Sequence, residues 1–332
     1  MKAIVYTKYG PPDVLQFKEV EKPSPKDGKI LVRIHAASVN ALDRHLLRSK
    51  PSLLRIITRS GLLKPKDPRL GVDIAGRVEA VGNNVTQFQP GDEVFGVAWG
   101  GFAEYACAAE SKLALKPANL SFEAAAAVPV AALTALQGLR DTGQIQPGQK
   151  VVIQGASGGV GTFAVQIAKS FGAEVTAVCS TRNVDMVRSI GADQVIDYTQ
   201  EDFTRNGQRY DLILAVNGYH PILAYRRALS PKGVYVLAGE GSNAHLFRAA
   251  LQAMLLGPLI SRTGRQKMGF MGISKINQQD LVFVKELLEA GKVVPVIDRC
   301  YPLRETAEAL RYLEEEHARG KVVITMDHDD NT

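Results

Sequence analysis

The chain has 332 residues, a formal net charge of +6 and 45% hydrophobic content, with no low-complexity tract and no short-period repeat. This composition is typical of a globular protein and excludes the disordered and fibrous classes. The length of the chain favours two domains. No signal peptide or bilayer-spanning run is seen, so we expect a cytoplasmic protein or the processed form of an imported one.

The first 120 residues contain short alternating runs separated by turn signals and predict a mostly β unit. From Ser121, which is a suitable helix N-cap, the alanine-rich segment Ala124–Leu139 predicts a helix interrupted near Pro129. The strands expected in the β unit are Ile30–Ile34, Gly76–Val81, Glu93–Val97 and Ala103–Cys107.

From Val151 onward, apolar runs alternate with helical patterns, which predicts a parallel, doubly wound sheet. A helix at Gln278–Ala290, a strand at Val294–Cys300, a helix at Glu305–Glu316 and a strand at Lys321–Thr325 are expected to follow. The strands expected in the sheet are Val151–Ile153, Glu174–Val178, Gln194–Ile196, Asp211–Ala215, Gly233–Ala238 and Met268–Gly272.

The segment Val151–Gly161 ends a short β-branched run in a glycine-rich turn that opens a helical stretch. Glycines permit a tight turn and close approach to a pyrophosphate, and the helix N-terminus offers unpaired N–H groups to phosphates. The turn predicts a dinucleotide site at Ser157, Gly158, Gly159 and Val160, although an ordinary tight turn has the same pattern.

Two basic stretches, 44–66 and 248–267, supply much of the positive charge. Neither has the interleaved aromatic residues of a single-strand nucleic-acid groove, so no nucleic-acid partner is expected. A solvated face is the simplest interpretation, while a cofactor phosphate, an anionic substrate or a membrane surface remain open. The apolar run Leu251–Ile260 favours burial at a subunit interface.

The cysteines Cys107, Cys179 and Cys300 are far apart and show no CxxC spacing. Neither a disulfide framework nor a zinc knuckle is indicated, and each is expected to be a small buried hydrophobe.

Five segments together resemble the medium-chain dehydrogenase/reductase superfamily, within it the zinc-free quinone oxidoreductase-like (zeta-crystallin-like) branch. The resemblance implies an α/β fold, with a GroES-like mostly-β catalytic domain at 1–124 and 275–332 and a Rossmann doubly wound parallel-sheet domain at 125–274. The active site is then expected in the cleft between them. The resemblance also implies a homodimer. The five segments are 71–82, 90–96, 101–105, 151–161 and 191–198.

The resemblance also argues against zinc. Asn40 and Gly71-Val72-Asp73 stand where zinc-dependent relatives place a ligand cysteine and Gly-His-Glu, and the four-cysteine lobe is missing. Asn40 is a poor zinc ligand and Val72 is none. We therefore expect no metal.

The segment Val178–Arg182 favours NADPH over NADH. An acid at this position binds the ribose hydroxyls in NAD-selective folds, whereas here Ser180 and Thr181 can donate hydrogen bonds and Arg182 can pair with a 2′-phosphate. The resemblance adds Tyr198 and Lys321 near that phosphate, and a nicotinamide region formed by Thr134, Val216, Asn217, Gly239, Phe270 and Met271.

Without a metal, hydride transfer requires a substrate that accepts it readily, such as a quinone or an α,β-unsaturated carbonyl. The candidate donor to the developing oxyanion is the Asn40 amide. Relatives often carry a tyrosine five residues later, where this chain has His45, a candidate general acid if it is not a partly exposed loop residue. Asp43 is expected to be structural.

Two alternatives remain open from the sequence. One is an NADPH-binding protein with little turnover, crystallin- or regulator-like. The other is a reductase of apolar substrates that works at a membrane surface.

Overall fold

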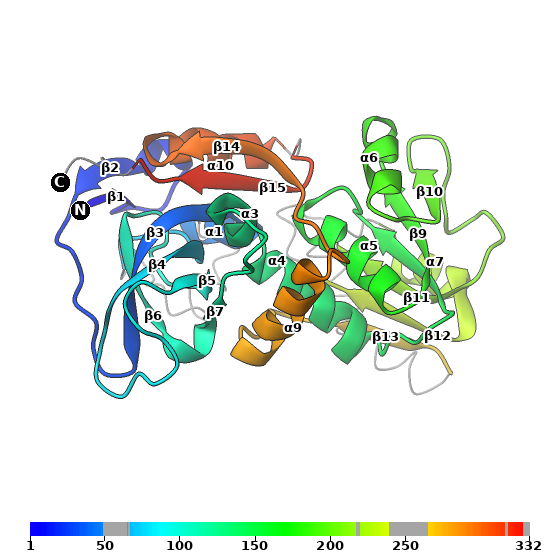
Figure 1. The fold of residues 1–332 in the computed structure, drawn as a ribbon. Helices are drawn as coiled ribbons and strands as arrows, with labels where there is room; N and C mark the ends of the chain where they lie inside the picture. Colours follow the sequence, from blue (N-terminus) through cyan, green and yellow to red (C-terminus); the bar gives the residue numbers. More distant parts are fainter. Residues whose placement is uncertain (49–64, 66, 217–219, 239–264, 316–317, 328–332) are drawn as a thin grey trace. The chain divides into compact units, whose positions relative to one another are not determined.

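The computed structural model describes residues 1–48, 65, 67–216, 220–238, 265–315 and 318–327 (Figure 1). The chain divides into two compact units. One comprises Met1–Val130, Ile276–Glu289 and Pro295–Thr332, and the other comprises Ala131–Lys275 and Ala290–Val294. The mostly antiparallel sheet of the first and the parallel sheet of the second confirm the predicted fold class.

The first unit is built on a sheet with the strand order β14-β15-β3-β4-β5-β7, in which β6 also pairs with β3. A separate antiparallel pair is formed by β1 and β2. The strands are β1 (Lys2–Val5), β2 (Gln16–Glu19), β3 (Lys29–Val39), β4 (Asp73–Val81), β5 (Glu93–Val97), β6 (Tyr105–Ala109), β7 (Leu113–Leu115), β14 (Ile297–Pro302) and β15 (Lys321–Thr325). The helices are α1 (Ala41–Arg48), α3 (Phe122–Ala126), α9 (Gln278–Glu289) and α10 (Thr306–Glu314).

The second unit contains a fully parallel sheet with the strand order β10-β9-β8-β11-β12-β13. The order reverses between β8 and β11, which is the point where doubly wound sheets bind ligands, beyond the carboxyl ends of the strands. The strands are β8 (Lys150–Gln154), β9 (Glu174–Cys179), β10 (Gln194–Asp197), β11 (Tyr210–Ala215), β12 (Leu229–Leu237) and β13 (Lys267–Phe270). The helices are α5 (Gly159–Ser170), α6 (Val184–Ser189) and α7 (Ile222–Ala228).

The division between the units falls within α4 (Pro129–Gln137). The predicted interruption of the alanine-rich helix is confirmed, since α3 ends at Ala126 and α4 begins at Pro129. Proline suits a first helical position because its missing N–H has no intrahelical partner there. The predicted cap is also confirmed, because Ser121 Oγ accepts from the Ala124 N–H at 3.2 Å.

The expected environment of the cysteines is only partly correct. Cys179 is buried, whereas Cys107 is half-buried and Cys300 is exposed. All three are free thiols.

Within the described part of the chain, no helix is both long and apolar enough to cross a membrane. The membrane-surface alternative depends on the basic stretches 44–66 and 248–267, of which residues 49–64 and 248–264 lie outside the described residues.

Candidate active site

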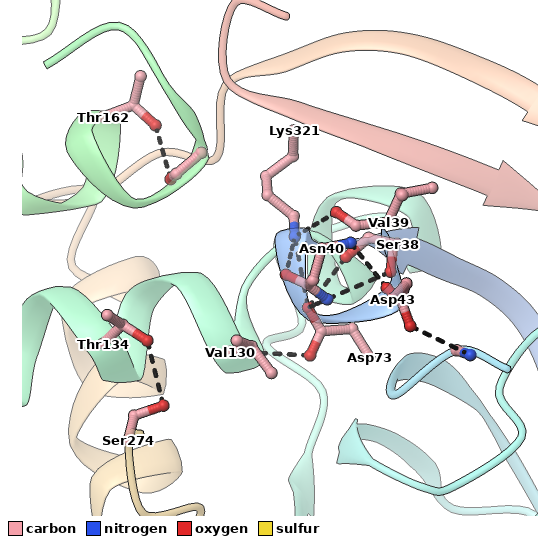
Figure 2. A network of polar contacts seen from close by, with 12 residues as sticks. Ser38, Val39, Asn40, Asp43, Asp73, Val130, Thr134, Thr162, Ser274 and Lys321 are labelled. Atoms are coloured by element: carbon pink, nitrogen blue, oxygen red, sulfur yellow. Dashed lines mark hydrogen bonds and ion pairs between the residues drawn. The ribbon is translucent and has the colours of Figure 1, made fainter. Parts of the chain in front are cut away.

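A buried polar cluster forms at the carboxyl end of β3, where the chain turns into α1 (Figure 2). The pairing of β3 with β4 places Ser38 opposite Asp73, and β15 pairs with the same end of β3. Asn40 follows β3 directly, and Lys321 is the first residue of β15. Strand register therefore brings together polar side chains from three distant segments.

Lys321 lies at the centre of this cluster and is only 3% exposed. Its Nζ donates to Asn40 Oδ1 at 2.7 Å, to the Val39 carbonyl at 3.1 Å and to Asp73 Oδ2 at 3.4 Å. These oxygens can use all three N–H groups of the ammonium. Burial lowers the pKa of Lys321, and the charge of Asp73 opposes that shift. The geometry does not support the expectation that Lys321 binds a cofactor phosphate.

The Asn40 amide is held in one orientation by its neighbours. Its oxygen accepts from Lys321, and its Nδ2 donates to Asp73 Oδ2 at 2.9 Å. The second amide hydrogen is directed toward the Ser38 carbonyl at 3.4 Å, which is long for a hydrogen bond. One N–H of Asn40 is therefore firmly committed and the other only weakly.

Asp73 is fully buried and joins the ends of several elements. Its Oδ2 also accepts from Ser38 Oγ at 3.0 Å, and its Oδ1 accepts from the Val130 N–H at 3.0 Å, in the first turn of α4. A carboxylate at a helix N-terminus is stabilised by the unpaired N–H groups there. In the sequence, Asp73 stands out only as the last residue of the segment Gly71-Val72-Asp73, and this role was not predicted from it.

Asp43 has the structural role expected for it. Its Oδ2 accepts from the Asn40 N–H at 2.8 Å, so the carboxylate reaches back to cap α1, and its Oδ1 accepts from the Gly71 N–H at 3.2 Å. Burial raises the pKa of Asp43 to about 7, opposed by the hydrogen bond from Asn40 and helped by the charge of Asp73.

His45 is a buried residue of α1, 5% exposed, and not the partly exposed loop residue considered from the sequence. Its imidazole therefore has a defined place in the unit that holds Asn40. The assignment of His45 as a general acid stays a prediction.

The residues around Asn40 do not fit a zinc ion. Zinc prefers thiolate, imidazole or carboxylate ligands, and Val72 provides none of these. The Asn40 oxygen and the Asp73 carboxylate are both bonded to the Lys321 ammonium, which would repel a nearby dication. Among the described residues, no group of three or more His, Cys, Asp and Glu side chains could hold a metal ion.

The glycine-rich turn after β8 has the geometry that a dinucleotide site requires. Gly155 has a φ of +78°, which L side chains rarely adopt. A Cβ at Gly161 would lie 2.0 Å from the Gly155 carbonyl oxygen, so only glycine allows this close packing of helix and turn. Gly158 is the N-cap residue of α5 and provides no side-chain hydrogen bond to the helix. A Cβ at Gly158 would meet only the Gly155 oxygen, at 3.6 Å. Among the described residues, no side chain therefore caps the first N–H groups of α5, and there is space beside them.

The expected cofactor residues of the second unit gather at one edge of the parallel sheet, beyond the carboxyl ends of its strands. Thr134 lies on α4 instead, where it is buried and donates from Oγ1 to Ser274 Oγ at 3.1 Å (Figure 2). Asn217 and Gly239 lie outside the described residues. The residues at the edge are Ser157, Gly158, Gly159 and Val160 after β8, Ser180, Thr181 and Arg182 after β9, Tyr198 after β10, Val216 after β11, and Phe270 and Met271 at the end of β13.

An acid that the sequence analysis missed lies near the end of β9. β10 pairs with β9 so that Asp197 is opposite Cys179, and Thr181 donates from its hydroxyl to Asp197 Oδ2 at 2.5 Å. The N–H and hydroxyl of Thr199 donate to Oδ1 of the same carboxylate. These hydrogen bonds, that of Thr181 first, lower the pKa of Asp197. The hydroxyl proton of Thr181 is thus directed to Asp197. The prediction from the sequence was that Thr181 donates to the cofactor.

Comparison with known proteins agrees with this architecture. Residues 26–118 match the model of the alcohol dehydrogenase GroES-like domain, and residues 190–324 match that of a zinc-binding dehydrogenase. The chloroplast envelope quinone oxidoreductase homolog of Arabidopsis thaliana is 32% identical over 98% of both chains.

Two further relatives are similar to most of this chain. The NADPH-dependent alkenal/one oxidoreductase of Arabidopsis thaliana chloroplasts is 33% identical over 98% of this chain and 79% of its own. The solved structure of the quinone oxidoreductase from Coxiella burnetii matches with a TM-score of 0.84 and 29% identity, over 98% of this chain and 99% of the other. The chain therefore belongs to the medium-chain dehydrogenase/reductase superfamily, in its zinc-free quinone oxidoreductase-like branch.

Proposed function

We propose that this protein is an NADPH-dependent, zinc-independent reductase that transfers hydride to quinones or α,β-unsaturated carbonyls. The observation that carries the proposal is the Lys321 ammonium bonded to Asn40, which stands where the resemblance places a ligand cysteine of zinc-dependent relatives, and to Asp73. A lysine cation there supplies the local positive charge without an open coordination position. Two relatives named as a quinone oxidoreductase homolog and an alkenal/one oxidoreductase support the substrate class.

NADPH, when bound, supplies the hydride, and the residues of this chain bind and orient the cofactor and the substrate. The N-terminus of α5 and the glycine-rich turn would hold the pyrophosphate. Ser180 and Arg182, after β9, would hold the 2′-phosphate. We now assign Thr181 to the support of that turn through Asp197, and Lys321 to the support of Asn40.

Asn40 is the group that we propose to meet the oxygen of the substrate. Its second N–H has only the 3.4 Å contact with the Ser38 carbonyl, so a developing oxyanion can replace that acceptor at small cost. Its first N–H and its oxygen stay bonded to Asp73 and Lys321 and hold the amide in place. Preorganisation of this kind is the usual source of oxyanion stabilisation.

The direct test is NADPH consumption with 1,2- and 1,4-quinones, enones, 2-alkenals and a simple ketone, each with and without a chelator. We expect chelator-insensitive turnover of a quinone or an enone, faster with NADPH than with NADH. Tight NADPH binding without turnover of any substrate in the panel would instead favour a binding protein. Loss of turnover on metal removal would contradict the zinc-independent mechanism.

A variant tests the role of Asn40 separately. Asn40→Ala should lower kcat by about 10²-fold or more, as loss of an oxyanion donor does elsewhere, with little change in the Kd for NADPH. Asn119→Ala is the control, because this exposed residue donates from its amide to the Leu288 carbonyl, away from the cluster. Equal kcat losses in both variants would argue against the assignment.

A further inference from the structure

Asn183 joins the glycine-rich turn to the end of β9, a connection that the sequence analysis did not anticipate. Its Nδ2 donates to Ser157 Oγ at 3.1 Å and to Ser180 Oγ at 3.0 Å. Ser157 lies in the turn after β8, and Ser180 directly follows β9. One buried amide nitrogen therefore bridges the two loops that the proposed cofactor would contact.

The direction of these hydrogen bonds determines what the serines can offer. Each serine hydroxyl accepts from Asn183, so its own proton is available to a second partner. Among the described residues, neither hydroxyl has another hydrogen-bond partner. Two O–H donors that share one nitrogen lie close enough together for the oxygens of a single phosphate to accept from both.

The amide oxygen of Asn183 supports this orientation. It is buried and has no hydrogen-bond partner in the described part of the chain, and Asn183 is only 4% exposed. Turning the amide over would give the oxygen both serine protons but would leave the NH₂ group buried and unpaired. Orphaned buried N–H groups are rarer than under-satisfied carbonyl oxygens, so the observed orientation is the favourable one. An unpaired buried group of this kind calls for an explanation beyond stability.

We propose that Asn183 is a positioning residue that turns the hydroxyl protons of Ser157 and Ser180 toward the 2′-phosphate of NADPH. The inference rests on the proposed function. The end of the second strand is where doubly wound folds recognise the ribose 2′ position, and Arg182 directly precedes Asn183 and stands two residues after Ser180. Asn183 thereby sets the preference for the phosphorylated cofactor without touching it.

The test compares the Kd values for NADPH and NADH, from quenching of protein fluorescence, in the full-length protein. Asn183→Leu removes the donor at similar volume and without adding charge. We expect its Kd for NADPH to rise about tenfold and its Kd for NADH to change less than twofold. The double variant Ser157→Ala/Ser180→Ala should show the same pattern, and adding Asn183→Leu to it should have no further effect.

Each outcome has a distinct meaning. Equal weakening of NADPH and NADH by Asn183→Leu, or additivity with the serine variants, would overturn the positioning role and leave a structural one. Failure of the wild-type protein to bind NADPH would overturn the proposed function itself. Asn183→Ser, which keeps a short donor, should recover part of the NADPH affinity. This partial rescue provides a check if Asn183→Leu does not fold.

Discussion

Lys321 donates to the side-chain oxygen of Asn40 at 2.7 Å, although 281 positions separate the two residues in the chain. The contact exists because β15 pairs with the carboxyl end of β3. It fixes the direction of the Asn40 amide, since the oxygen must face the ammonium and the nitrogen then faces Asp73. The C-terminal strand of the first unit thus controls which hydrogen-bonding atoms Asn40 offers to a substrate.

Replacing Lys321 by Met should lower the free energy of unfolding by about 3–5 kcal/mol, because the Asp73 carboxylate is then buried without its cation. Urea denaturation measures this cost. Lys285→Met, which breaks a more exposed pair with Glu289 on the surface of α9, should cost less than about 1 kcal/mol.

The double variant Lys321→Met/Asp73→Asn separates the ion pair from packing. It should recover part of the loss, because the Asp73 charge left without its cation is removed as well. If Lys321→Met lowers the free energy of unfolding as little as Lys285→Met does, the buried pair contributes little to stability.

Asp43 should make stability depend on pH. Burial raises its pKa in the folded state to about 7, above the ordinary value of 3.8 in the unfolded chain. The stabilising contribution is therefore full below about pH 4 and is lost as the pH rises to about 7, by up to about 1.4 kcal/mol per pH unit. Above pH 7 both states are ionised and the dependence ends.

The Asp43→Asn variant tests this dependence because it cannot titrate. The free energy of unfolding of the wild type minus that of the variant should fall from pH 5 to pH 7 and then stay nearly constant to pH 8. Chemical denaturation at four pH values in this range measures it. A difference that grows with pH would mean that the folded pKa of Asp43 is lowered.

Local signals in the sequence were sufficient for much of the fold. The break at Pro129, the cap at Ser121 and the alternation of strands and helices after Val151 are each encoded within a few residues, and the structure has all of them. The glycine-rich turn was likewise readable, because positive φ and close packing impose glycine at Gly155 and Gly161.

The polar contacts of the site could not be read in the same way. The helix α1 was missed because its sequence is charged, yet Asp43, Arg44 and His45 are buried in it. The approach of Asp197 to Thr181 depends on the pairing of β10 with β9, and sequence distance from the end of β9 concealed it. Such contacts depend on strand register and therefore need the three-dimensional structure.

Two glycines of the turn should respond differently to the same substitution. Gly161→Ala forces a Cβ to within 2.0 Å of a backbone oxygen, so the turn must shift, and we expect a loss of about 1–3 kcal/mol or more in the free energy of unfolding. Gly158→Ala has a φ of −84° and space for the methyl group, so its stability should stay within about 1 kcal/mol of wild type.

Gly158→Ala should weaken cofactor binding strongly although it has little effect on stability. Its methyl group would occupy the space beside the N-terminus of α5, where the pyrophosphate is proposed to bind, and should raise the Kd for NADPH by about tenfold or more. Thermal denaturation and fluorescence titration measure the two effects. Unchanged NADPH binding in a stable Gly158→Ala protein would place the pyrophosphate elsewhere.

Arg182 should distinguish the two nicotinamide cofactors. It is exposed after β9, where the 2′-phosphate is proposed to bind, and a charge-assisted hydrogen bond contributes about 1.5–3 kcal/mol. Arg182→Ala should therefore raise the Kd for NADPH by about 10- to 100-fold and leave that for NADH nearly unchanged. Arg188→Ala, on the exposed face of α6 beside Asp185, is the matched control and should change neither value. If the Arg182 variant keeps its preference for NADPH, the 2′-phosphate is not held by this turn, and the carboxylate of Asp197 would then favour the ribose hydroxyls of NADH.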